Sequence, residues 1–154
     1  MNKKVIFGIS LLLIAIFAIG SASAFDFDLM LGGSGNETVT IDGIDFNIPA
    51  GFSEDPNHET VNKTNEQSGI TYVTNGKLYE KGDTIVTMLV ADYGKHKVTD
   101  EIAESVGGDA KTINNVNGYL AHKGKFSVFN YAKNDKLVVI STNDESVIGD
   151  FIME

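Results

Sequence analysis

The 154-residue sequence contains no cysteine and no arginine. Without cysteine the chain forms no disulfide, and thiol catalysis, cysteine-ligated iron–sulfur clusters and cysteine-based zinc sites are excluded. A bacterial-type lipoprotein is excluded as well, because its anchor needs a cysteine at the processing site. Without arginine the chain lacks the side chain that most often clamps phosphate and carboxylate groups in a bidentate manner. The fold must therefore be held together by packing rather than by covalent cross-links.

Positive charge is also scarce, since 12 basic residues face 21 acidic ones and the formal net charge is −9. A chain of this charge is repelled by phosphates, so it is a poor candidate for binding nucleic acids or anionic lipid headgroups, and no nucleic-acid partner is expected. Solubility explains the acidity more simply than attraction of a cationic partner does. At 42% hydrophobic residues the chain has enough apolar material for a core, which argues against wholesale disorder.

The first 24 residues have the pattern of an export signal. Lys3 and Lys4 precede an apolar run over residues 5–19, and the small residues Ala22 and Ala24 flank Ser23 as signal peptidase requires. The apolar segment is also long enough for a spanning helix, which needs about 20 residues. A cleaved signal and a retained membrane anchor are therefore both open, with the Ala-Ser-Ala site favouring cleavage. Either outcome places the rest of the chain outside the cytoplasm.

Residues 25–36 are predicted to be a flexible linker or tail, because residues 31–36 are rich in glycine. Residues 37–154 are predicted to form one domain. Two sequons occur in the exported part, at Asn36-Glu37-Thr38 and Asn62-Lys63-Thr64. Asn36 and Asn62 are therefore candidate acceptors for an N-linked glycan. Chance is the alternative, because the chain is rich in asparagine and threonine.

Alternating apolar residues and turn dipeptides predict most of the strands. A hairpin is expected over residues 38–48, with its turn at Asp42-Gly43. Two further hairpins are expected at Asn75-Gly76, within residues 70–79, and at Asn117-Gly118, within residues 111–122. The polar stretch from residue 54 to residue 68 is predicted to be a loop.

The rest of the pattern predicts one central strand, two further strands and two helices. Residues 84–93 are apolar almost throughout, which indicates a central strand, and residues 125–132 and 137–141 are expected to join at Asn134-Asp135. A short helix is expected to start near Thr99 and to end at Gly107-Gly108. Thr142 and Glu145 form the pattern of a capping box that would open a C-terminal helix.

The predicted fold class is therefore α+β. An antiparallel twisted sheet of about six to eight strands would be packed by a short middle helix and a C-terminal helix, after an N-terminal signal or anchor helix.

Three runs give the sequence a resemblance to known proteins. The Phe-x-Ile-Pro-x-Gly-Phe run over residues 46–52 resembles the opening of PsbP-like domains, and residues 113–119 and 126–140 resemble their late meander. The chain is also similar to small exported proteins of unknown function from methanogenic archaea. The resemblance covers residues 37–154 and implies a sheet-and-helix accessory or binding domain. It carries over no catalytic residues.

No motif in the sequence predicts a catalytic, metal or cofactor site. His58, His96 and His122 are far apart, and no serine lies in a Gly-x-Ser-x-Gly elbow. The acidic pairs at residues 100–101 and 144–145 are explained by helix starts, where negative charge is favourable. The pair at residues 54–55 lacks the spacing of a calcium loop.

The function expected from the sequence is that of a non-enzymatic, extracytoplasmic binding or interaction module. It would be secreted, or tethered to the cell membrane through an uncleaved N-terminal segment, and would bind an unknown protein or glycan at the cell surface. A sheet face or the segment 54–68 would be the contact surface. Most aromatic residues of the strands are expected to pack in the core, and an exposed aromatic row is the alternative. Two alternatives stay open. One is an extracytoplasmic hydrolase, which needs a concave pocket with a histidine beside a carboxylate or serine. The other is a structural component of the cell envelope.

Intact-mass measurement on the protein from its native host tests the export signal. We expect a mass that starts at Phe25 in the medium, because the small residues at Ala22 and Ala24 suit signal peptidase. A full-length mass confined to the membrane fraction would instead identify a retained anchor.

Overall fold

The computed structural model describes residues 35–67 and 69–154. The signal segment 1–24, its cleavage site at Ala22, Ala24 and Phe25, and nearly all of the linker lie outside the described residues. Within the described part of the chain, no helix combines the length and the apolar character that crossing a membrane requires.

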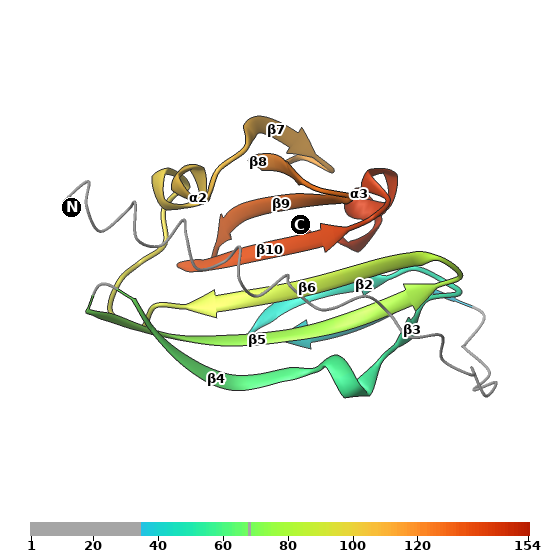
Figure 1. Ribbon diagram of the computed structural model, residues 1–154, viewed down its shortest axis with the longest axis horizontal. Helices are drawn as coiled ribbons and strands as arrows, with labels where there is room; N and C mark the ends of the chain where they lie inside the picture. Colours follow the sequence, from blue (N-terminus) through green and yellow to red (C-terminus); the bar gives the residue numbers. More distant parts are fainter. Residues whose placement is uncertain (1–34, 68) are drawn as a thin grey trace.

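Strands dominate the architecture. They form an eight-stranded antiparallel sheet of order β3-β5-β6-β10-β9-β8-β7, with β4 pairing β5 beside β3, and a separate hairpin of β1 and β2 (Figure 1). The strands are β1 (Glu37–Ile41), β2 (Ile44–Ile48), β3 (Ser53–Glu54), β4 (Thr60–Gln67), β5 (Ile70–Lys81), β6 (Thr84–Asp92), β7 (Asp109–Ile113), β8 (Val116–Lys123), β9 (Phe126–Lys133) and β10 (Lys136–Thr142). The helical elements are η1 (Pro56–His58), α2 (Asp100–Val106), η2 (Glu145–Val147) and α3 (Ile148–Phe151).

Both faces of the large sheet bear a hydrophobic core. The first face is covered by the β1–β2 hairpin and by α3, which bring residues such as Phe46 and Phe151 against Val138 and Ile140. The second face is covered by α2 and the segment before it, and its core contains Ile102. In Figure 1, α2 and α3 lie near opposite ends of the strands.

The sequence predicted the antiparallel sheet and its approximate number of strands, and the structure confirms this coarse class. The helices are few and short, since α2 has seven residues and α3 has four. The fold is therefore mostly antiparallel sheet, and the predicted N-terminal helix lies outside the described residues.

The predicted turns at Asn75-Gly76 and Asn117-Gly118 are wrong, since both dipeptides lie inside strands. A β-carbon on Gly76 would lie 2.8 Å from the carbonyl oxygen of Met88, and one on Gly118 would lie 2.6 Å from that of Asn130. Glycine is therefore required at these positions by close approach of a neighbouring strand, and a two-residue turn is not formed. Residues 70–81 consequently form one continuous strand instead of a hairpin.

The true turns use asparagine and aspartate in the left-handed region. The predicted turns at Asp42-Gly43 and at Asn134-Asp135 are confirmed, with φ values of 48° and 76° in the first and 51° and 63° in the second. The turn between β7 and β8 is made by Asn114 and Asn115, at φ values of 47° and 62°. Paired positive φ values are typical of type I′ hairpins.

The predicted loop over residues 54–68 is wrong for most of its length. Asp55 caps η1 by accepting a hydrogen bond from the backbone N–H of Asn57 at 2.9 Å, and β4 then pairs with β5. The segment looked loop-like because β4 is an edge strand and is largely exposed, so it needs few apolar residues.

Helix α2 follows the prediction, since it starts after Thr99 and ends at Gly107 with a φ of 109°. The prediction of a capping box at Thr142 and Glu145 is wrong. Asp144 caps η2 by accepting from the backbone N–H of Ser146 at 3.1 Å, and the side chain of Glu145 turns to Lys111 instead. The C-terminal helix therefore begins as a 3₁₀ turn.

Substitution of Gly118 tests the close-approach explanation. Gly118→Ala should lower the free energy of unfolding by about 1–3 kcal/mol, the usual cost of overpacking. The matched variant Asn117→Ala alters the neighbouring exposed residue, so it should cost less than about 1 kcal/mol. Urea denaturation of both variants provides the measurement, and equal losses would contradict the explanation.

Candidate functional site

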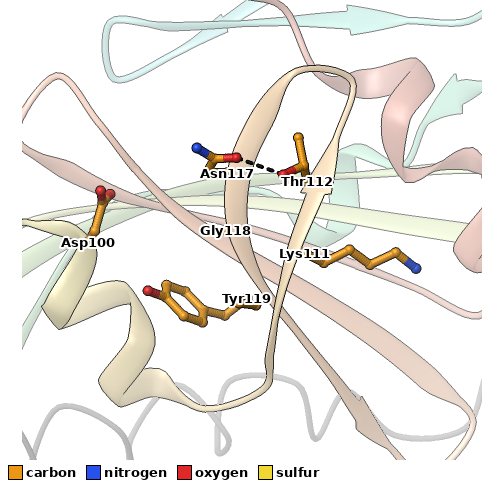
Figure 2. A pocket seen from close by; sticks show the side chains of 7 residues that line it. Asp100, Lys111, Thr112, Asn117, Gly118 and Tyr119 are labelled. Atoms are coloured by element: carbon orange, nitrogen blue, oxygen red, sulfur yellow. Dashed lines mark hydrogen bonds between the residues drawn. The ribbon is translucent and has the colours of Figure 1, made fainter.

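A depression of about 210 Å³ lies between the β7–β8 hairpin and the start of α2. Its lining combines one aromatic ring with hydroxyl, amide and carboxylate groups, and the residues that line it are Asp100, Ala110, Lys111, Thr112, Asn117, Gly118 and Tyr119. Figure 2 shows the Tyr119 ring directed toward α2, whereas the Lys111 side chain points to the other side of the hairpin. We call this feature the Tyr119 depression.

The hairpin and α2 hold the depression in shape through two contacts. On the hairpin, the Thr112 hydroxyl donates to the Asn117 carboxamide oxygen at 2.7 Å (Figure 2). Under α2, the buried Asn130 side chain donates to the Ala103 carbonyl at 2.6 Å. Because Asn130 is the cross-strand partner of Tyr119, this bond fixes α2 beside the tyrosine.

Negative charge surrounds the tyrosine. Desolvation, followed by the carboxylates of Glu104, Asp100 and Glu101, raises the pKa of Tyr119 above its usual value. The phenol is therefore protonated at neutral pH and is available as a hydrogen-bond donor. A neutral or cationic group suits this environment, while an anionic group is repelled.

On the first face of the sheet, four polar side chains meet near the start of the C-terminal turn. Ser127 Oγ lies 3.2 Å from His122 Nδ1 and donates to Glu145 Oε2 at 3.3 Å. Glu145 also pairs with Lys111 at 2.7 Å and lies 3.7 Å from His122 Nε2. We call these residues the Glu145 cluster.

The Glu145 cluster has the residue types of a hydrolytic triad but not its setting. Glu145 is closer to Ser127 than to His122, and Lys111 is its nearest partner. The hydrogen bond from Lys111 is the largest of the causes that lower the pKa of Glu145, so this carboxylate already has a cationic partner. Ser127 is 9% exposed on a paired strand whose backbone N–H groups serve the sheet ladder. An oxyanion hole needs free donors.

The remaining histidines and carboxylates serve local structure or stand apart. His58 Nδ1 lies 2.6 Å from Asp55, and Glu54 pairs with Lys77 at 2.7 Å, so both carboxylates of the pair at residues 54–55 already have partners within the chain. His96 joins neither of these clusters. Across residues 35–67 and 69–154, no three acidic or histidine side chains gather as a metal site requires.

Most strand aromatics are in the core, as expected, and an exposed aromatic row is not found in the described part of the chain. Tyr72 and Tyr93 stack at 4.8 Å inside the core, and Phe129 and Tyr131 are buried on the opposite face. Within the same ranges, Val61 on β4 is the one large hydrophobic side chain that is exposed, at 63%. Tyr119, by contrast, is half-buried and lines the depression.

The two sequon asparagines lie on different parts of the structure. Asn36 precedes β1, and its carboxamide oxygen accepts a hydrogen bond from the backbone N–H of Ala50 at 3.3 Å. Asn62 lies in the edge strand β4 with an exposed side chain.

Comparisons with protein-family models, with curated proteins and with solved structures find no match for this chain. The likeness to PsbP-like domains therefore stays a prediction from residues 46–52, 113–119 and 126–140.

Sequence reasoning missed the polar side of the depression. Asp100 was explained by the helix start, and Asn117 by a turn that does not form. The available signal was Thr112-x-x-x-x-Asn117, which places two polar side chains as cross-strand partners once the turn is moved to Asn114 and Asn115.

The pH dependence of the free energy of unfolding tests the ion pair between Glu145 and Lys111. Because the folded pKa of Glu145 is below its ordinary value of 4.5, its stabilisation is present above that pH and is lost as the pH falls through the folded pKa. Glu145→Gln should therefore destabilise at pH 7, by less than about 1 kcal/mol for a pair this exposed, and match the wild type at the lowest pH. Thermal unfolding from pH 7 to pH 3 measures this. Glu66→Gln, which removes a carboxylate with no ion pair in the described residues, is the control, and an equal effect there would contradict the assignment.

Proposed function

We propose that this protein is an exported, non-enzymatic binding module that binds a neutral saccharide of the cell surface through the Tyr119 depression. The single observation that carries the proposal is the composition of the depression, in which a tyrosine ring lies among hydroxyl, amide and carboxylate groups. Export is supported by residues 1–24, with the domain released or tethered by the N-terminal segment.

A saccharide matches the chemistry of these side chains. The apolar face of a sugar ring packs on an aromatic side chain, and its hydroxyls both donate and accept hydrogen bonds. Asp100 supplies acceptors, Asn117 supplies both donor and acceptor groups, and the protonated Tyr119 supplies a donor. A neutral ligand also avoids repulsion by the net charge of −9.

The size of the depression limits what it can hold. Pockets that enclose a drug-sized ligand usually measure about 300–1,000 Å³. A volume of about 210 Å³ suits one sugar unit of a longer chain, with the neighbouring units outside. We therefore expect affinity to be modest and to rise when several domains bind one glycan.

The hydrolase alternative has one observation in its favour, the 3.2 Å contact between His122 and Ser127. It is weaker because Glu145 is engaged by Lys111 and because the Tyr119 depression lies on the opposite side of the sheet. The structural-component alternative depends on a retained anchor and is decided by the intact mass.

Binding measurements on variants of the depression test the proposal. We would screen the folded domain on an array of surface polysaccharides and measure the best ligand by calorimetry. Tyr119→Ala should weaken binding at least about tenfold, which corresponds to about 1.4 kcal/mol, because the stacking surface is lost. Tyr119→Phe keeps that surface and should retain part of the affinity.

The matched control is Phe126→Ala, which removes a partly exposed aromatic ring outside the depression. Binding that is unchanged in Tyr119→Ala, or equally weakened in Phe126→Ala, would contradict the proposal. Cleavage of a bound glycan that stops in Ser127→Ala would favour the hydrolase instead.

A further inference from the structure

The outer edge of the sheet at β4 has a local irregularity at its sequon. Strand β4 pairs with β5 on one side, and no described strand pairs with its other side. The register shifts between Thr60 and Lys63, which identifies a β-bulge, and Asn62 within it has a φ of 46°. A bulge turns the backbone away from the regular ladder and exposes the side chain it carries.

Asn62 differs from Asn36 in the freedom of its carboxamide. The backbone N–H of Asn62 donates to the Asn75 side-chain oxygen at 2.7 Å, which holds the bulge in place. Its own side chain is exposed and makes no hydrogen bond to another described residue. The carboxamide of Asn36, by contrast, accepts from the backbone of Ala50. Thr64, the hydroxyl residue of the second sequon, is exposed as well.

We propose that Asn62 is the N-glycosylation site of the exported protein and that the glycan shields the open edge of β4. In the transfer, Asn62 Nδ2 attacks the anomeric carbon of a lipid-linked saccharide and forms the N–C bond. The bond from that carbon to the lipid phosphate oxygen breaks, the lipid phosphate leaves, and the amide loses one proton to a base of the transferase. The inference rests on the export part of the proposed function and not on the Tyr119 depression.

The unpaired edge of β4 and the exposed Val61 side chain are what the glycan would shield. An unpaired strand edge is a template for pairing with another chain, and β4 is eight residues long without a proline. Val61, exposed at 63%, is the neighbour of Asn62. A hydrated saccharide at the bulge would block a second copy of the chain from approaching this edge. Lys63 and Glu66 add charge to the strand but leave Val61 uncovered.

Glycopeptide mass analysis of the protein from its native host tests the modification. The peptide with Asn62 should carry added saccharide mass in the wild type and in Thr64→Ser, and should lose it in Thr64→Ala. Thr38→Ala, which removes the other sequon, should leave the mass at Asn62 unchanged. Exported protein with an unmodified Asn62 would overturn the inference while leaving the proposed function intact. Full-length protein confined to the cytoplasm would overturn export, and with it both proposals.

Sedimentation analysis tests the shielding. Thr64→Ala protein lacking the glycan should self-associate at concentrations at which the wild type is monomeric. Adding Val61→Lys to that variant should restore the monomer, because a charge replaces the exposed apolar side chain. A Thr64→Ala protein that stays monomeric at every concentration would overturn the shielding role.

Discussion

The constraint on which the rest of this structure depends is that the central strands must be buried on both faces. Strand β10 is buried at every position after Lys136, and Val138, Ile140 and Phe129 have no exposed surface. Each face therefore needs its own cover, which the β1–β2 hairpin with α3 provides on one side and α2 on the other. Short elements are sufficient to cover a face, because burial of a few large side chains stabilises the packing of each element by roughly 1.5–3 kcal/mol per side chain.

Close packing of these layers explains why two Asn-Gly dipeptides lie within strands. Local propensity assigns Asn-Gly to a tight turn, but at Gly76 and Gly118 a neighbouring strand occupies the space that a β-carbon would need. At Gly118 the Phe129 ring fills that space, since its nearest atom lies 2.6 Å from the position that a β-carbon would take. A local sequence pattern does not reveal a tertiary contact of this kind. The chain turns instead at Asn114-Asn115, between β7 and β8, and at Gly82-Asp83, between β5 and β6.

What the sequence could predict follows from the same physics. The alternation around Asp42-Gly43, the apolar strand at 84–93 and the stop of α2 at Gly107 depend on local chemistry, and all three are confirmed. Strand β4 escaped prediction because an edge strand buries little and pairs through its backbone. The Glu145 cluster and the Tyr119 depression escaped because each joins residues from separate elements. Only the packing of η2 and α2 against the sheet brings Glu145 to Lys111 and Asp100 to Tyr119.

Burial of the central strands on both faces also determines which parts of the sheet are accessible to a ligand or a modifying enzyme. Inward positions on β6, β9 and β10 are filled by core side chains, so accessible chemistry is displaced to the margins. One margin is the β7–β8 hairpin, where the Asn130–Ala103 hydrogen bond attaches α2 to the sheet beside the Tyr119 depression. The other margin is β4, where a bulge places Asn62 outside the ladder. The proposed binding and modification sites lie at opposite edges of the sheet, so a glycan on β4 would leave the Tyr119 depression open.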